Sequence, residues 1–208
     1  MTPRQLLLAA LIALALTLLS IFLIDGAVAR AVGVPSPGVA RVVRGFTGAT
    51  EIVSGMTLSK FALGFALIAA GIVAYFVKGW RAASAPLLYV GVTHFIARLV
   101  AGVLKNVFGR LRPLEAHGAD SWFVGGGAMP SGHAIHWWAL FFPLALLFPR
   151  WRWPLLLMPV LISIARVAVN DHYVGDVMAS AFLAALTAWA LSRFARAPYR
   201  AAARPAPR

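Results

Sequence analysis

Six apolar segments are the feature of this 208-residue chain that most restricts its fold. A helix needs about 20 residues to cross the roughly 30 Å of hydrocarbon in a bilayer, and about 17 is the lower limit. Backbone groups in hydrocarbon must bond to one another, so each segment is predicted to be a helix. We therefore expect an all-α integral membrane bundle with about six transmembrane helices, in a single domain over residues 1–208. The predicted spans are Leu6–Ile24, Met56–Val77, Ala82–Leu104, Gly132–Phe148, Pro154–Val169 and Val174–Leu191.

Composition and charge support this class and exclude others. The chain is 61% hydrophobic and only 12% charged, which is too little polar surface for a soluble domain of this size. It has no cysteine, so disulfide and thiolate chemistry are excluded. A net charge of +13 can indicate nucleic-acid binding, but no nucleic-acid motif accompanies it here. Much of the basic excess lies in short loops and in the tail that begins at Ser192, so we expect the tail to contact anionic lipids and expect no nucleic-acid partner.

The distribution of charge predicts the orientation. Basic loop residues fall on one side of the six-span arrangement, and the positive-inside rule makes that side, with both termini, cytoplasmic. All six acidic residues fall on or near the other side, although Arg30, Arg41, Arg44 and Arg110 lie there too and oppose the trend. We expect a bacterial inner-membrane protein whose acidic side faces the periplasm. The basic loop residues are Arg4, Lys78, Arg81, Arg150 and Arg152.

Three parts of the chain lie outside this simple pattern. Arg4 and the small residues at 27–29 resemble a signal peptide, but the apolar stretch is longer than the ~7–15 residues of a signal core, which favours a retained helix. Residues 25–55 contain prolines and glycines and form either a connecting loop or an amphipathic segment on the membrane surface. Residues 198–208 are rich in Ala, Pro and Arg, a composition that predicts disorder.

Three polar clusters emerge from the same predicted membrane face. The first holds Lys105 and Arg112, the second is the sequence PSGH at 130–133, and the third holds Arg166, His172 and Asp176. Taken singly, each has an ordinary structural explanation, such as cations that snorkel to the interface or a Pro-Ser-Gly helix start. Arg166 is the hardest to dismiss, because a charge near the end of a span is costly unless it is paired or functional.

Taken together, the clusters suit phosphate chemistry. Cations and the free N–H groups of a helix that opens at Ser131 and Gly132 can bind a phosphate. Asp176 follows His172 by four residues, which would place it on the same helical face, where it can orient the imidazole as a nucleophile. His133 is then available as a general acid. Carboxylates are too few for a metal cage, so we expect no metal and no cofactor.

The order and spacing of these motifs resemble the type 2 phosphatidic acid phosphatase family, which also includes soluble vanadium haloperoxidases and bacterial acid phosphatases. The matching patterns are Lys105-x6-Arg112-Pro113, Pro130-Ser131-Gly132-His133 and Arg166-x5-His172-x3-Asp176. The resemblance implies a lipid phosphate or pyrophosphate phosphatase that acts through a phosphohistidine on His172, with His133 as general acid. It implies that Lys105, Arg112, Ser131, Gly132 and Arg166 bind the phosphate. Ala165 departs from the family, whose third motif begins Ser-Arg.

Four further polar residues are candidates for a substrate path or for headgroup binding. His94 and Arg98 lie four apart in the third span, and intramembrane ionisable groups favour a functional role, although a buried pair closed by carbonyls is an equal alternative. Glu115 and His117 lie in the outer loop, together with Asp120, where loop placement fits headgroup selection. His136 is expected to pack behind His133.

Two other functions stay open at this stage. A lipid phosphotransferase would use the same phosphohistidine and pass the group to a second lipid. A membrane transporter would line a path with these charges, but the sequence has no internal repeat of the kind common in transporters. The substrate is not readable from the sequence, so phosphatidylglycerophosphate, phosphatidic acid, undecaprenyl pyrophosphate and lipid A phosphate all remain candidates.

Overall fold

The computed structural model describes residues 1–116 and 122–202, and for residues 195–202 it describes the backbone alone. Every regular element in these ranges is helical, so the all-α prediction is confirmed. A π-helical turn at Ser20–Ile24 joins the first two helices, and a 3-10 turn at Pro149–Trp151 precedes α7. The helices are α1 (Pro3–Leu19), α2 (Asp25–Val32), α3 (Pro37–Val53), α4 (Ala62–Phe76), α5 (Arg81–Phe108), α6 (Gly132–Leu147), α7 (Arg152–Ala168) and α8 (Val174–Ala202).

All six predicted apolar segments are helical. Within residues 1–116 and 122–202, four stretches are long and apolar enough to cross a membrane, namely Pro3–Val32, Arg81–Phe108, Pro149–Ala168 and Val174–Phe194. The apolar helices α4 and α6 are shorter and lie in the same bundle. The predicted second span begins too early, because residues 56–61 form turns before α4. The third ends too early, because α5 continues past Lys105 until Gly109, where a left-handed φ of 49° ends the helix.

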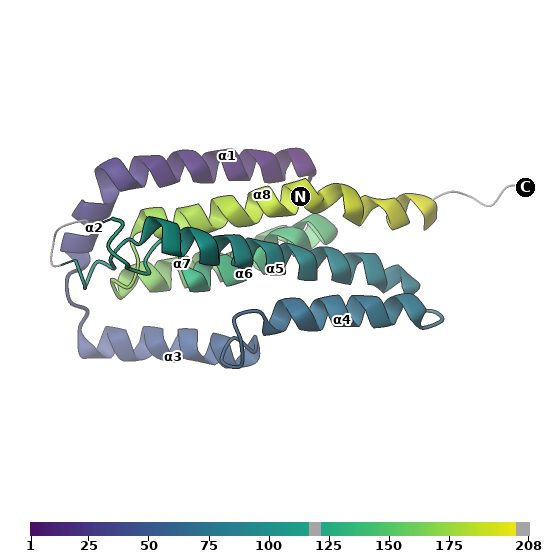
Figure 1. Cartoon of the computed structure of the whole chain (residues 1–208), viewed down its shortest axis with the longest axis horizontal. Helices are drawn as coiled ribbons and strands as arrows, with labels where there is room; N and C mark the ends of the chain where they lie inside the picture. The colour runs from purple at the N-terminus through teal and green to yellow at the C-terminus, as the bar shows by residue number, and fades with distance from the viewer. Residues whose placement is uncertain (117–121, 203–208) are drawn as a thin grey trace, which may run out of the picture.

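The bundle is built around α8. Helix α1 packs along α8, α5 and α6 pack against α8 and against each other, and α4 covers the outer side of α5 (Figure 1). Successive spans run in opposite directions, so the end of α5, the start of α6, the end of α7 and the start of α8 meet at one end of the bundle. The three polar clusters of the sequence lie on these four helix ends.

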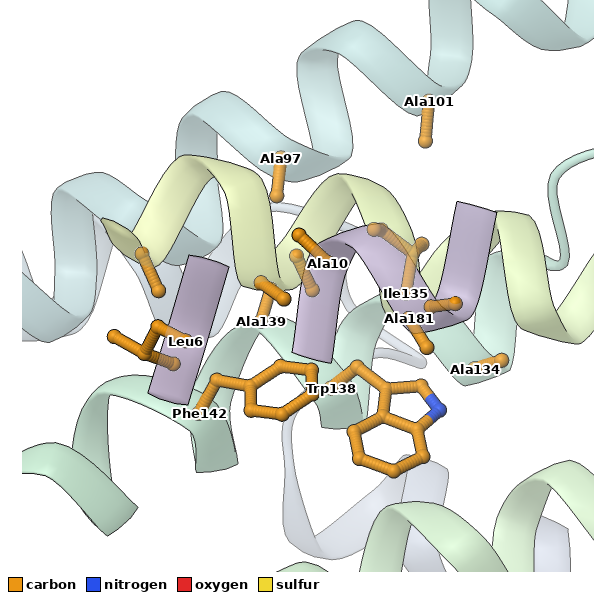
Figure 2. Close-up of a cluster of buried hydrophobic side chains, with 14 of the residues drawn as sticks. Leu6, Ala10, Ala97, Ala101, Ala134, Ile135, Trp138, Ala139, Phe142 and Ala181 are labelled. Atoms are coloured by element: carbon orange, nitrogen blue, oxygen red, sulfur yellow. The ribbon is translucent and has the colours of Figure 1, made fainter. Parts of the chain in front are cut away.

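Alanine dominates the core between these helices. Ala10, Ala97 and Ala139 are fully buried in a cluster contributed by α1, α5, α6 and α8 (Figure 2). Lipid chains are as apolar as leucine, so membrane helices associate mainly through close backbone approach, which small residues allow. Trp138 and Phe142 stack at 4.8 Å between ring centroids and fill the wider space beside them. This packing holds the ends of the helices in register.

Residues 25–55 are not a plain connecting loop. They form α2 and α3, and Asn170, which follows α7 with a φ of 55°, donates through Nδ2 to the carbonyls of Ala29 at 2.9 Å and Gly33 at 3.0 Å. These bonds satisfy the last carbonyls of α2 and attach it to the loop before α8. Helix α3 lies at the edge of the bundle, runs along the direction of the spans in Figure 1, and has exposed apolar side chains such as Val42 and Ile52.

The last helix extends into the basic tail. Helix α8 continues to Ala202, and the disorder expected for residues 198–208 stays a prediction. An apolar helix can extend into a short Ala-rich sequence that follows it, because adding a residue to an existing helix avoids the costly step of helix nucleation. Residues 203–208 lie outside the described residues, as do residues 117–121 of the outer loop.

A buried arginine connects three chain segments at the end of the bundle where the polar clusters lie. Arg110 is fully buried, and its guanidinium binds Asp176 Oδ1 and Asp25 Oδ2, both at 2.8 Å. Its Cζ lies 3.8 Å from the ring centroid of Tyr173 and 4.5 Å from that of Trp122. Two carboxylates and two aromatic faces therefore balance one buried cation and join α2, the end of α5 and the start of α8.

Replacement of Arg110 by Met is expected to destabilise the protein by about 3–5 kcal/mol, because it leaves two buried carboxylates without their cation. Arg150→Met, at an exposed position, is the matched control and should change stability by less than about 0.5 kcal/mol. Thermal unfolding of the purified proteins in detergent measures both. Equal melting temperatures for the two variants would contradict a structural role for this cluster.

Candidate active site

His172 and Asp176 lie side by side at the start of α8. His172 precedes the helix, so the pair does not stack on a helical face as the spacing predicted. Asp176 occupies the first turn instead, and its Oδ2 accepts a hydrogen bond of 2.9 Å from the N–H of Tyr173. The same oxygen lies 3.5 Å from Nδ1 of His172, which is longer than a normal hydrogen bond but close enough to orient the ring. Nε2 is then the nitrogen left free for chemistry.

Burial of His172 lowers the pKa of its imidazole and so favours the neutral form. The residue is only 2% exposed, and loss of hydration lowers the pKa of the His172 imidazole, while the Asp176 carboxylate opposes this shift. A pKa below the usual value of about 6.5 leaves the imidazole unprotonated at neutral pH. The unprotonated ring carries the lone pair that a nucleophile needs. The direction of this shift is the one that the predicted nucleophile needs.

The start of α6 faces the same place. Ser131 is the N-cap, with its Oγ 3.5 Å from the N–H of Ala134, and its own N–H donates to the carbonyl of Asp176 at 3.2 Å. Ser180 Oγ donates to the Ser131 carbonyl at 3.1 Å. These bonds attach the start of α6 to the first turns of α8. The first N–H groups of a helix have no acceptor within the helix, so the start of α6 at Gly132 and His133 can bind an anion at its positive end.

The three predicted phosphate-binding cations surround these groups. Arg166 is buried, pairs with Asp171 at 2.7 Å, and accepts the His172 N–H at its carbonyl at 3.3 Å. Lys105 donates from Nζ to the Gly127 carbonyl. Arg112 is 41% exposed, and its charge acts on both Lys105 and Arg166. The structure therefore brings the three sequence motifs to one place.

His133 has a carboxylate partner that the sequence analysis missed. Its Nε2 contacts Oε1 of Glu51, which comes from the last turn of α3. A carboxylate at this distance stabilises the protonated imidazole, which is the form a general acid must have. The side chains of His133 and Glu51 are 18% and 33% exposed, so both lie at the mouth of the site rather than in its interior.

The four candidates for a substrate path or for headgroup binding each have different surroundings. His94 is fully buried, with Nε2 3.1 Å from Nδ1 of His136, so this ring belongs to a closed pair and not to a path. Arg98 donates to the Gly132 carbonyl at 2.8 Å and so lies directly behind the start of α6. Glu115 accepts from the N–H of Arg112 at 3.0 Å and is half exposed. His117, like Asp120, lies outside the described residues.

Residues that the sequence analysis did not name contact the predicted site residues from behind or beside them. Glu51, Arg110 and Asp171 each contact a predicted site residue, and only Asp171 has a local signal, since it directly precedes His172. No group of three or more His, Cys, Asp or Glu that could hold a metal occurs in the described part of the chain. The donors that converge here are cations and N–H groups, which bind an anion.

The fold is that of an integral membrane protein of helical type, with two histidines and three cations of the sequence motifs at one end of the bundle. Residues 86–200, more than half of the chain, match the PAP2 superfamily, and this protein belongs to it. The matched region contains all three motifs, so the resemblance to type 2 phosphatidic acid phosphatases is confirmed.

Comparison with individual proteins agrees with this assignment. The chain is similar to lipid A 1-phosphatase of Rhizobium etli, with 38% identity over 98 residues that cover 44% of this chain and 42% of the relative. It is 36% identical over 116 residues to lipid A 1-phosphatase of Rhizobium johnstonii, covering 50% of this chain and 48% of the relative. The matches thus span about half the length of these relatives.

A solved structure shares the whole fold. The crystal structure of a transmembrane PAP2-type phosphatidylglycerolphosphate phosphatase from Bacillus subtilis superposes with a TM-score of 0.61 and covers 99% of both chains. The sequence identity is 22%. The likeness therefore extends over α1 to α8 and confirms the transmembrane bundle predicted from the apolar segments.

Glu51→Gln is expected to lower turnover of an alkyl phosphate by about 10-fold, because His133 loses the carboxylate that favours its acidic form. Turnover of an aryl phosphate should fall much less, since an aryl oxide needs little protonation to leave. Arg41→Gln, at an exposed position of the same helix, is the control for a change of charge on α3. Steady-state kinetics on both substrates measures the effect. Equal losses on the two substrates would show that Glu51 only anchors α3.

Proposed function

We propose that this protein is a phosphatase of membrane lipid phosphates or pyrophosphates that works through a phosphohistidine intermediate. The observation that carries the proposal is the meeting of His172, backed by Asp176, with His133 and the cations Lys105 and Arg166 at one end of the bundle. A nucleophile, a general acid and a phosphate site are the three parts that phosphoryl transfer needs.

In the first step, Nε2 of His172 attacks phosphorus in line with the bond to the lipid oxygen. The N–P bond forms as the P–O bond breaks, and Asp176 stabilises the positive charge that develops on the ring. His133 gives its proton to the departing lipid oxygen. In the second step, water attacks the phosphohistidine, His133 takes a proton from that water, and inorganic phosphate leaves with His172 restored.

The charge on the equatorial oxygens has to be balanced throughout. Lys105, Arg112 and Arg166 supply three cations, and Ser131 and the backbone at Gly132 supply hydrogen-bond donors at the positive end of α6. The cations occupy the positions where a metal phosphatase needs carboxylates, so the chemistry uses no metal and should persist in excess EDTA.

The substrate is a lipid carrying a terminal phosphate. The relatives in Rhizobium are lipid A 1-phosphatases and the structural relative is a phosphatidylglycerolphosphate phosphatase, so both lipids are candidates here. Phosphatidic acid and undecaprenyl pyrophosphate complete the panel to be tested. Release of inorganic phosphate from each lipid identifies the substrate, and transfer to a second lipid without release would favour a phosphotransferase.

His172→Ala is expected to abolish the phosphoenzyme, because Nε2 is the attacking atom. His133→Ala should still form it, with turnover of an alkyl phosphate lowered by roughly 10²–10⁴-fold, the usual contribution of one general acid. The loss should be smaller for an aryl phosphate or a pyrophosphate. The measurement is turnover together with trapping of labelled enzyme, both in EDTA. If the His172→Ala protein is labelled and the His133→Ala protein is not, then His133 is the nucleophile and the two proposed roles are reversed.

The orientation follows from charge, since most loop cations lie at the end of the bundle opposite the site. We place the protein in a bacterial inner membrane with its site toward the periplasm and its basic tail against anionic lipids. The chain has no cysteine, so single cysteines can be introduced into the natural sequence. Val124→Cys, 58% exposed near the site, should react with an impermeant thiol reagent in intact spheroplasts, and Gly79→Cys should not. The reverse labelling pattern would place the site in the cytoplasm.

A further inference from the structure

A cavity of about 470 Å³ adjoins the phosphate site on the side of α4 and α5. Lys60 and Phe61, just before α4, form one wall, and Arg98 of α5 forms another. Lys105 and Gly132 line the cavity and also belong to the proposed phosphate site, so the cavity borders that site. A volume of this size is typical of small-molecule sites.

The cavity is strongly cationic. Lys60, Arg98 and Lys105 line it, and none of the described residues around it is acidic. Lys60 forms no ion pair with any residue that the structure describes, and its Nζ lies 5.3 Å from the ring centroid of Phe61. Three cations on one wall repel one another, and within the described part of the chain only Lys105 is offset in part by a carboxylate, that of Asp176, so the wall is suited to an anionic ligand.

Arg98 contributes a second, independent observation. Its side chain is only 7% exposed and its Nε has no hydrogen-bond partner among the described residues, although one terminal nitrogen donates to Gly132. A buried donor left unpaired costs free energy, and buried polar groups in proteins are almost always bonded. Because Arg98 also lines the cavity, its buried positive charge lies at the wall where an anionic ligand would be held.

The remaining walls suit a lipid. Leu99 and Val103 line the cavity and are 48% and 57% exposed on the outer face of α5. Apolar side chains exposed on a membrane helix contact hydrocarbon, so a chain can leave the cavity along this face. An anionic group in the cavity can therefore belong to the same lipid whose terminal phosphate lies at His172.

We propose that the cavity between Lys60, Arg98 and Lys105 binds a second phosphate of the substrate, within a few bonds of the phosphate that is cleaved. This rests on the proposed phosphatase function and narrows its substrate class. Lipids with a diphosphate or with a phosphodiester beside the terminal phosphate have such a group. Phosphatidic acid, with a single phosphate attached to its glycerol, does not.

Lys60→Gln tests the subsite without touching the bonds that Arg98 makes to α6. The measurement is kcat/KM of the full chain in micelles on a polyprenyl diphosphate, on phosphatidylglycerol phosphate and on phosphatidic acid. The ratio of a two-phosphate lipid to phosphatidic acid should fall about 10-fold in Lys60→Gln, the scale of one lost hydrogen bond to a charged group. Lys78→Gln, which removes the same charge just after α4, should leave the ratio unchanged.

The outcomes separate the alternatives. A fall for the diphosphate alone or for the phosphodiester alone supports the subsite and identifies its ligand. An unchanged ratio in Lys60→Gln overturns the proposal, as does an equal fall in Lys78→Gln, which would reflect general attraction of anionic micelles.

A binding experiment keeps this test independent of activity. If the wild-type protein hydrolyses none of the lipids, the proposed function fails, and the subsite is then judged by inorganic anions. Pyrophosphate should raise the melting temperature more than phosphate does, and Lys60→Gln should abolish that difference. Equal shifts by the two anions in the wild-type protein would overturn the subsite.

Discussion

The buried cation of Arg110 is the interaction on which the geometry of the site depends. It binds Asp25 of α2 and Asp176 of α8 at 2.8 Å each, and Asp25 also accepts the N–H of Gly175 at 2.8 Å. An ionised group deprived of water is stable only when every partner is in place, so these segments can occupy few relative positions. Because Asp176 also faces His172, the ion cluster that orders the fold also sets the orientation of the proposed nucleophile.

The two histidines differ because their surroundings differ. His172 is enclosed, and burial keeps its imidazole neutral, with Nδ1 toward a carboxylate that is itself held by Arg110. His133 lies nearer the surface and contacts Glu51, a carboxylate from a helix that has few contacts with the rest of the bundle. The two side chains are identical, but they differ in burial and in the carboxylate that each one contacts, and these are the features on which their proposed roles rest.

The proposed substrate site lies where a polar surface meets an apolar one. The start of α6 supplies N–H groups to the phosphate, Arg98 holds the Gly132 carbonyl behind it, and the outer face of α5 is apolar. A lipid phosphate has both characters, because its headgroup is anionic and its chains are not. The end of the bundle where α5, α6, α7 and α8 meet is the place where both surfaces are within reach of one molecule.

The sequence by itself determined the class of the protein and named the candidates for its reactive groups. Apolar length predicts the helices because a bilayer has a fixed thickness, and the three motifs name His133, Arg166 and His172 because their spacing along the chain is specific. Only the tertiary structure decided which groups accompany them. Glu51 is 82 residues from His133, and Arg110 is 85 residues from Asp25 and 66 from Asp176. Such pairs have no local periodicity, because their proximity arises from the packing of α2, α3, α5 and α8 around one end of the bundle.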